Sequence, residues 1–389
     1  MTAMTFDRLH RTPGTHRRER GISLIEMMVG ILIGLVCVLV ILQLLSSWEG
    51  RKRTTTSGSD AQTSGTLAAF TLDRDLRLAG YGFGLAGSDV MGCNVPATNT
   101  TVGPLNFLLR PVEIEQGATA DKPDIIRVLY GNSPYFVASQ PMLSSTPTAK
   151  TLKSRDGFQK GDVMLVTGNT PVDCRFVEIT DQDIADAVTL KHEATSYTTF
   201  AGVLKNAEWN TAAGTLTTFS TGRVFNLGPA PVRSIWTVNP TTQTLTRYNS
   251  FREAPDKAVD IAADVVTLKA QYGIDANDNG IIESSEWKDP DPTLVIADWT
   301  KVRAIRFGIL VRSRQYERAE LNSGVAVTPA SPTWAEGSQS FTMKNLDGSN
   351  DSGGGAITGP DAPNNWRNYR YRVYENVVPL RNMIWGTAP

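Results

Sequence analysis

The stretch RRERGISLIEMMVGILIGLVCVLVILQLL, residues 17–45, decides the fold of this chain. Its last 24 residues, Ile22–Leu45, are predominantly apolar and long enough to cross a bilayer as one helix. The segment nevertheless contains a carboxylate at Glu26, five residues after Gly21. A charged side chain in such a segment is costly unless it has a partner. The position of Glu26 therefore has to be explained together with the helix.

Three interpretations of this segment compete. A secretory signal has an apolar core of about 7–15 residues and a small-residue cleavage site, which the longer run and its exit at Leu44–Trp48 match poorly. A plain transmembrane anchor fits the length, and the five arginines before the run predict a cytoplasmic N-terminus. In the third interpretation a protease cuts between Gly21 and Ile22. The new amine of a neighbouring subunit would then pair with Glu26 and set the axial register of bundled helices.

The third interpretation agrees with a known family. The sequence RGISLIEMMVGILIG, residues 20–34, resembles the prepilin signature of type IV pilins: a basic leader, a glycine, an apolar residue, a short Ser-Leu-Ile run and a glutamate. The resemblance implies that a prepilin peptidase cuts after Gly21 and methylates the amine of Ile22, and that Glu26 acts in assembly. The family usually has phenylalanine where this chain has Ile22, a departure that leaves the motif intact.

Composition and charge disfavour several classes of function. The net charge is −1, but residues 1–21 carry +3, so no large basic field for nucleic acid follows Leu45. Of the three histidines only His192 follows the apolar run. A Ser-His-Asp, Cys-His or multi-histidine metal site would have to be built around it, which disfavours most hydrolases. We predict no catalytic residues, although counting residues does not exclude a glycosidase with a carboxylate pair.

Two cysteines in the soluble part are candidates for a disulfide. Cys93 and Cys174 lie 81 residues apart. In an oxidising periplasm a disulfide between them is the natural expectation, and two unpaired thiols are the alternative.

The remaining pattern predicts an α+β fold, with a long N-terminal hydrophobic α-helix followed by a large β-rich globular head. Apolar residues at helical spacing after residue 65 indicate that the helix continues, with interruptions at Gly58 and Gly65; they are Ala69, Leu72, Leu76 and Ala79. The predicted divisions are a leader (1–21), a transmembrane or filament-core helix (22–45), its amphipathic continuation (46–80) and a periplasmic or extracellular head (81–389).

Six segments of the head read as strands, because they are short, β-rich and bounded by turn residues; they are 124–131, 162–168, 234–248 (a hairpin), 265–274, 301–314 and 369–382. In the segment 265–274 apolar residues alternate strictly, from Val266 to Ile274. This alternation predicts a strand with one buried face.

The loop DANDNGIIESSE, residues 275–286, matches the twelve-residue calcium pattern D-x-[DN]-x-[DN]-G-x₅-E in full. Its candidate ligands are the side chains or carbonyls of Asp275, Asn277, Asn279, Ile281, Glu283 and Glu286, with Gly280 at the sharp turn. A strand leads into the loop where an EF-hand has a helix, and an ion-free Asn-Gly turn is the alternative. We expect weak calcium binding, on the order of 10⁻⁴–10⁻³ M.

The head carries looser similarities over nearly its whole length. LRLAGYGFG (76–84), the hairpin around Trp236, KVRAIRFGILVRS (301–313) and YRVYENVVPLRNMIW (371–385) resemble the PilW-type minor pilins of type IV pili. Relatives include the J-type pseudopilins of type II secretion, which have smaller heads. The 344 residues after Leu45 favour the pilus protein.

The resemblance implies a minor pilin that takes part in initiation or in a tip complex of the pilus, and so in adhesion and twitching motility. It would be a single-pass protein of a Gram-negative inner membrane with a periplasmic head, and later part of the extracellular pilus. Its expected partners are other minor and major pilins, the prepilin peptidase, the inner-membrane assembly platform and a pilus-tip adhesin. The alternatives are a type II secretion pseudopilin and, from another class, a membrane-anchored periplasmic enzyme or adhesin.

Overall fold

The computed structural model describes residues 21–88, 90–135, 138–169, 172–182, 186, 188–199, 201–210, 218–219, 221–317, 326–350 and 363–384. Apart from Gly21, the predicted leader lies outside the described residues. The chain forms two compact units, which meet between Thr55 and Thr56. We call the second unit, Thr56–Pro389, the head.

Helix α1 extends from Leu24 to Leu78. Glu26 lies in its first turn, where a negative charge interacts favourably with the helix dipole. The segment Leu24–Leu45 is the one helical stretch among the described residues that is long and apolar enough to cross a membrane, and none of it is buried. The predicted N-terminal apolar helix is therefore confirmed.

The last part of α1 belongs to the head and packs along one stripe of the helix. The buried residues of this stripe recur every three or four positions; they include Ala61, Ala68, Leu72, Leu76 and Ala79. The expected interruptions at Gly58 and Gly65 are wrong, because α1 continues through both. A Cβ atom on Gly65 would lie 2.0 Å from the ring of Tyr374. Glycine is required here so that the ring can lie directly on the helix.

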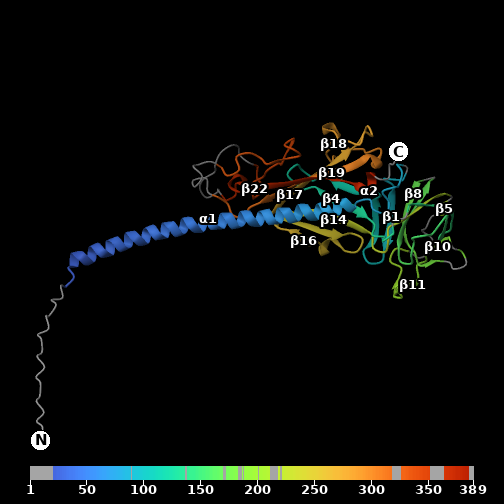
Figure 1. Ribbon diagram of the computed structural model, residues 1–389, viewed down its shortest axis with the longest axis horizontal. Helices are drawn as coiled ribbons and strands as arrows, with labels where there is room; N and C mark the ends of the chain where they lie inside the picture. Colours follow the sequence, from blue (N-terminus) through green and yellow to red (C-terminus); the bar gives the residue numbers. More distant parts are fainter. Residues whose placement is uncertain are drawn as a thin grey trace, which may run out of the picture. The chain divides into compact units, whose positions relative to one another are not determined.

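Two antiparallel sheets lie beside this part of α1 (Figure 1). The five-stranded sheet has the order β16-β15-β14-β4-β3, and the four-stranded sheet has the order β18-β17-β19-β22. Their strands are β3 (Val112–Glu115), β4 (Ile125–Tyr130), β14 (Val232–Asn239), β15 (Thr244–Asn249), β16 (Val259–Ala262), β17 (Val265–Ile274), β18 (Trp287–Lys288), β19 (Val302–Arg312) and β22 (Tyr371–Pro379).

A seven-stranded antiparallel sheet, of order β8-β7-β13-β5-β6-β10-β9, is inserted between β4 and β14. Its strands are β5 (Gln140–Ser145), β6 (Ala149–Leu152), β7 (Val163–Asn169), β8 (Val172–Glu178), β9 (Asp181–Gln182), β10 (Thr189–Lys191) and β13 (Gly222–Asn226). Residues on one side of this sheet, among them Met142, Leu152 and Val224, form a hydrophobic core of their own. Residues on its other side, such as Phe176 and Phe225, belong to the main core.

The chain enters and leaves this insertion at one place. The N–H of Asn132 donates to the carbonyl of Leu227 at 2.8 Å. Gly228 has a φ of 77°, and a Cβ atom on it would lie 2.3 Å from the backbone nitrogen of Ser133. The entering and leaving segments therefore touch, and the second one needs glycine to come this close.

The remaining elements of the described residues are short. They are β1 (Asn94–Asn99), β2 (Gly103–Leu108), β11 (Ser196–Thr198), β12 (Leu204–Asn206), β20 (Thr333–Trp334), β21 (Gln339–Ser340), the 3₁₀ helices η1 (Pro255–Lys257), η2 (Ser284–Glu286), η3 (Trp299–Lys301) and η5 (Trp366–Asn368), and helix α2 (Arg381–Ile384). The pairs β1-β2, β11-β12 and β20-β21 each form a two-stranded sheet.

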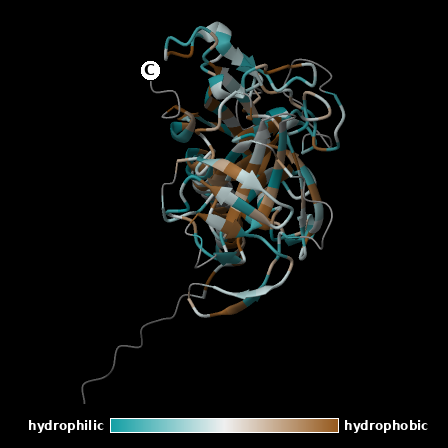
Figure 2. Ribbon diagram, turned by 90° about the vertical axis from the view of Figure 1, so that its right-hand side faces the viewer, coloured by the Kyte–Doolittle hydropathy of each residue, from teal (hydrophilic) through white to brown (hydrophobic). Residues whose placement is uncertain are grey.

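Hydrophobic residues gather on the strands in the middle of the head, and hydrophilic residues cover its outer loops (Figure 2). The largest fully buried side chains include Leu72 from α1, Trp236 from β14 and Phe307 from β19. Helix and strands therefore share one main core. The α+β class is confirmed, and each of the six predicted segments contains a strand.

One detail of strand β17 differs from the expectation. Its alternating apolar residues predicted one buried face, but Thr267 and Gln271 on the other face are buried as well. Gln271 accepts hydrogen bonds from the buried Arg306 of β19, and Arg306 stacks over the ring of Trp287 at 4.5 Å. Gln271 and Arg306 therefore pair with each other inside the protein, and because both are polar, the pattern of polarity did not reveal the burial of this face.

Candidate functional site

The three residues of the predicted processing motif lie at the start of α1. Gly21 and Ile22 precede the helix and are exposed. The first helical turn is closed by a 3.1 Å hydrogen bond from the N–H of Met27 to the carbonyl of Ser23. Glu26 is exposed between apolar neighbours such as Ile25, which is 71% exposed. The Gly21–Ile22 bond therefore lies outside the helix.

Within the described part of the chain, no hydrogen bond or ion pair holds the side chain of Glu26. A carboxylate among exposed apolar side chains needs a cation when those side chains become buried in lipid or protein. That cation has to come from outside the described residues. The roles of Gly21, Ile22 and Glu26 stay predictions.

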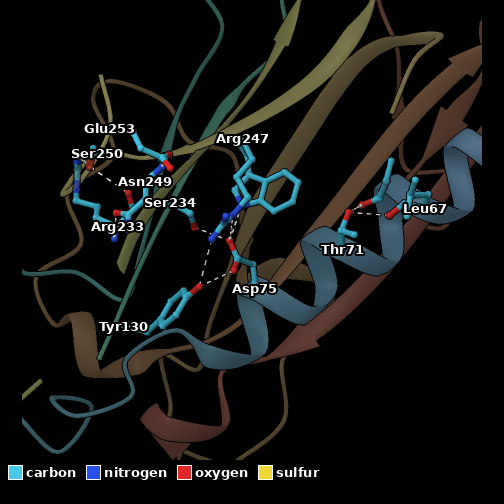
Figure 3. Close-up of polar contacts among 12 residues, drawn as sticks. Leu67, Thr71, Asp75, Tyr130, Arg233, Ser234, Arg247, Asn249, Ser250 and Glu253 are labelled. Carbon is cyan, nitrogen blue, oxygen red and sulfur yellow. Dashed lines mark hydrogen bonds and ion pairs between the residues drawn. The ribbon is translucent and has the colours of Figure 1, made fainter. Parts of the chain in front are cut away.

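A second polar site joins the end of α1 to the strands of the head, and the sequence alone did not reveal it. The buried carboxylate of Asp75 on α1 accepts hydrogen bonds from the hydroxyls of Tyr130 (2.8 Å) and Ser234 and from the indole N–H of Trp236 (2.8 Å). The guanidinium of Arg247 lies 3.1 Å from the same carboxylate. Figure 3 shows Tyr130 of β4, Ser234 of β14 and Arg247 of β15 pointing at Asp75 on the helix. We call this group the Asp75 junction.

The charges of the Asp75 junction compensate one another. Burial alone would lower the pKa of Arg247, but the attraction and hydrogen bonds of Asp75 outweigh it, so that the pKa is raised. Burial and the adjacent carboxylate raise the pKa of Tyr130, which keeps its hydroxyl protonated and donating. The carboxylate thus holds three strands on the helix through charge-assisted bonds, which are the strong class of hydrogen bond.

The candidate calcium loop is built as a tight turn after β17. The carboxylate of Asp275, itself buried, accepts hydrogen bonds from the backbone N–H groups of Asn279 and Gly280, each at 3.0 Å. The side-chain oxygen of Asn277 accepts from the N–H of Asn279 at 3.1 Å, and that of Asn279 accepts from the N–H of Ile281 at 2.8 Å. Gly280 has a φ of 79°, which explains the glycine at this position.

The end of the loop is closed by Glu286, in η2. Its carboxylate accepts from the backbone N–H groups of Ala276 and Glu283, both at 2.9 Å, and these bonds hold the pKa of Glu286 below its usual value. The ammonium of Lys301 lies 2.8 Å from the carboxylate of Asp278. The predicted ligands thus share one compact loop.

The donor set bears on the kind of metal site this loop can form. Nowhere in the described residues do three His, Cys, Asp or Glu side chains group as metal ligands. A calcium ion here would depend on the amide oxygens of Asn277 and Asn279 and on the carbonyl of Ile281, which are ligands that calcium accepts. The residues present therefore fit a weak oxygen site, and calcium binding stays a prediction.

We expect calcium to bind the isolated head with a dissociation constant on the order of 10⁻⁴–10⁻³ M, because asparagine at positions 277 and 279 lowers the charge of the ligand set. Titration calorimetry on the head measures this directly, with Glu286→Ala as the control that removes the predicted carboxylate ligand at the end of the loop. The absence of any heat change at millimolar calcium would end the calcium prediction.

The predicted disulfide is confirmed. Cys93 and Cys174 are bonded, with their Cα atoms 6.2 Å apart. Cys93 lies just before β1 and Cys174 lies in β8, so the bond ties the insertion to the segment that follows α1. Cys174 is fully buried in the main core.

His192 is unsuited to the catalytic role that a hydrolase would require of it. It is 1% exposed, and neither ring nitrogen has a hydrogen-bond partner. Burial and the nearby charge of Lys150 lower the pKa of His192 to about 3. A buried imidazole of such low basicity is a poor proton acceptor at neutral pH.

Comparisons with known proteins give two family matches. The family of type IV pilus-assembly protein W matches residues 234–382, and the prokaryotic N-terminal methylation motif matches residues 16–42. Among solved structures, a type IV-like pilin from Thermus thermophilus is similar, with 9% sequence identity, a TM-score of 0.32, and coverage of 82% of this chain and 94% of that chain. No curated protein sequence matches.

Proposed function

We propose that the chain is a PilW-type minor pilin of the type IV pilus, which is cut after Gly21 and acts in pilus initiation or at the tip. It is a membrane-anchored structural component that assembles with other pilus proteins. The observation that carries the proposal is the exposed carboxylate of Glu26 in the first turn of an apolar helix. Cleavage after Gly21 creates a positively charged amine at Ile22, which can pair with the Glu26 carboxylate of a neighbouring subunit.

The pairing follows from the geometry of a helix. Ile22 lies four residues before Glu26, so a new amine at Ile22 is about one helical turn from the carboxylate. When two such helices lie side by side with a matching stagger, the amine of one meets the carboxylate of the other. The partners for this contact are other pilins, because they share the methylation motif.

An end position in the filament agrees with the size of the head. The head holds a main core and the additional core of the seven-stranded insertion. In a closely packed shaft each head must fit between its neighbours, whereas a subunit at the tip has an open side. We further propose a Gram-negative inner membrane with the head in the periplasm, which the disulfide favours because disulfides persist in that compartment. The peptidase, the assembly platform and a tip adhesin are the further partners in this proposal.

The proposal is tested on the full-length protein in its own cells. The mature chain should begin at methylated Ile22, and Glu26→Gln should lower its amount in sheared pili at least tenfold, the effect of about 1.4 kcal/mol. Glu26→Asp, which keeps the charge, is the matched control and should retain most of the incorporation. Working pili that contain the uncut leader, or equal incorporation of Glu26→Gln, would contradict the proposal.

A further inference from the structure

Strand β22 has one unpaired edge. It is the last strand of the four-stranded sheet, and among the described residues it pairs with β19 alone. The N–H of Leu380 donates to the carbonyl of Arg303, and the N–H of Ser313 donates to the carbonyl of Arg370. Because hydrogen-bonded pairs alternate along an antiparallel ladder, the even-numbered residues of β22 bond to β19. The odd-numbered residues direct their N–H and C=O groups away from the sheet.

This edge is open in its central part. Within the described residues, the outward N–H and C=O groups of Val373 and Glu375 have no backbone partner. The N–H of Val377 bonds only to the side chain of the adjacent Asn376, at 2.9 Å. Glu375 is exposed, and so is Val377, which is 42% exposed although it is apolar. Such an edge is a template for another strand.

At two other sheet edges in the head, a side chain bonds to the backbone of the edge strand. At the edge strand β3, the N–H of Ile114 donates to the hydroxyl of Tyr272 at 2.6 Å. At the edge strand β8, the N–H and C=O of Glu178 both bond to the side-chain amide of Asn210. Among the described residues, the central part of the β22 edge lacks such a bond and so differs from the edges of β3 and β8.

Helix α1 runs beside the open edge and adds apolar surface to it. The hydroxyl of Tyr374 donates to the carbonyl of Gln62 at 3.1 Å, and the side chain of Asn376 donates to Asp73 at 2.8 Å. Leu67, Phe70 and Asp73 lie three residues apart, so they form one row on the helix surface.

The row leads from the contact with β22 to exposed apolar side chains. Leu67 is 46% exposed and Phe70 is 65% exposed. We call these two side chains and the edge Val373–Val377 the α1–β22 surface.

We propose that a neighbouring pilin adds an extended segment to the free edge of β22 and covers Phe70 and Leu67 with its apolar side chains. This inference rests on the proposed function. Strand addition supplies main-chain hydrogen bonds, and the side chains of the added segment supply specificity. The partner is a pilin because α1 continues from this surface into Leu24–Leu45, whose exposed apolar side chains pack in the same membrane or filament as those of other pilins.

A second copy of this chain does not fit. Gln62 contacts Tyr374, and the carbonyl of Leu78 accepts from Asn382, so α1 and β22 run in the same direction. If two β22 strands from two copies paired antiparallel, the two α1 helices would therefore run in opposite directions. Helices that enter one membrane from the same side cannot be arranged in this way.

Photo-crosslinking on the full-length chain in its own cells tests the partner. A benzophenone amino acid is placed at Phe70, at Val377, or at Val259 as the control. Val259 is 59% exposed on the edge strand β16 of the other sheet. We expect Phe70 and Val377 to crosslink to a protein with the methylation motif, identified by the sequence of the linked peptide. The control should give roughly tenfold less, as for a site outside the interface.

Three results would overturn the inference. The first is a pilin crosslink from Val259 with the same yield as from Phe70 and Val377. The second is crosslinks from Phe70 and Val377 to this chain itself, within one molecule or to a second copy. The third is the absence of any pilin crosslink although the chain is present in pili.

A matched pair of variants tests the edge itself. Glu375→Pro removes an outward N–H and leaves the bonds to β19 intact, because proline is tolerated where the N–H faces solvent. Glu375→Ala is the control: both variants lose the hydrogen bond from the N–H of Ala335 to the Glu375 carboxylate, and only alanine keeps the outward N–H. We expect Glu375→Pro to lower the crosslink yield from Phe70 about tenfold and Glu375→Ala to leave it within about twofold.

If Glu375→Pro does not fold, the variant Phe70→Arg replaces it as the test. Phe70 is exposed, so this variant should fold, and it should lower the crosslink yield from Val377. Yields unchanged by the folded variants would overturn strand addition. The two proposals fail separately. If the chain enters pili but the variants leave the crosslink yields at the α1–β22 surface unchanged, only this inference is contradicted. If the chain keeps its leader and is absent from pili, the proposed function is contradicted.

Discussion

Replacing Asp75 with alanine is expected to lower the free energy of unfolding of the head by about 3–5 kcal/mol, the usual cost of removing one partner of a buried ion pair. The change leaves Arg247 without its counter-charge and removes the acceptor of Ser234 and Trp236. Ser234 and Trp236 are buried, so water replaces their lost partner poorly, whereas the Arg247 side chain is 30% exposed and retains some solvent. Denaturant unfolding, followed by tryptophan fluorescence, measures the change.

Asp73 provides the matched control on the same helix. It pairs with Arg77, one turn away, at 2.6 Å and accepts a hydrogen bond from the exposed Asn376, and the Arg77 side chain is 39% exposed. Such an exposed pair contributes little, so Asp73→Ala should cost at most about 1 kcal/mol. Equal destabilisation by Asp73→Ala and Asp75→Ala would show that the Asp75 junction is not a special anchor of α1.

Reducing the disulfide is expected to lower the free energy of unfolding by about 4 kcal/mol. The bond closes a loop with a sequence separation of 81 residues, and the entropy removed from the unfolded chain grows with the length of the loop. The double variant Cys93→Ala/Cys174→Ala should unfold at lower denaturant concentration than the oxidised protein. Unfolding curves with and without reductant give the difference.

The remaining cysteine supplies the control for this measurement. Cys37 is free, so Cys37→Ser should leave both the oxidised stability and the response to reductant unchanged. A double variant as stable as the oxidised protein would mean that the bond constrains nothing in the unfolded chain.

The sequence was sufficient for features that depend on neighbouring residues. The apolar run, the strands such as β17 and the pattern of the loop 275–286 were all visible as local periodicity or spacing. The methylation motif and Glu26 are local for the same reason. Gly65 was misread because its partner, the ring of Tyr374, lies far along the chain, and a glycine in a helix otherwise suggests weakness.

Features built from distant residues were not visible. Asp75 bonds to residues 55 to 172 positions away, and nothing near it in sequence marks those partners. One local signal was available, because Asp75 falls on the same stripe of α1 as Leu72 and Ala79, where a charge requires a buried partner. Of the seven-stranded sheet only β7 was predicted. Strands β6, β9 and β10 have two to four residues, which is too short for a period to show.

The touching crossings at Asn132 and Gly228 have an evolutionary consequence. Since the ends of the inserted segment are in contact, its length has no influence on the spacing between β4 and β14. Descendants of this gene can lengthen or exchange the outer part of that segment, which has a core of its own, while its inner face stays in the main core beside α1. The exterior of the pilus can therefore change without a matching change in helix α1. Besides the two chain crossings, the disulfide from Cys93 to Cys174 is the covalent link between the segment and the rest of the head.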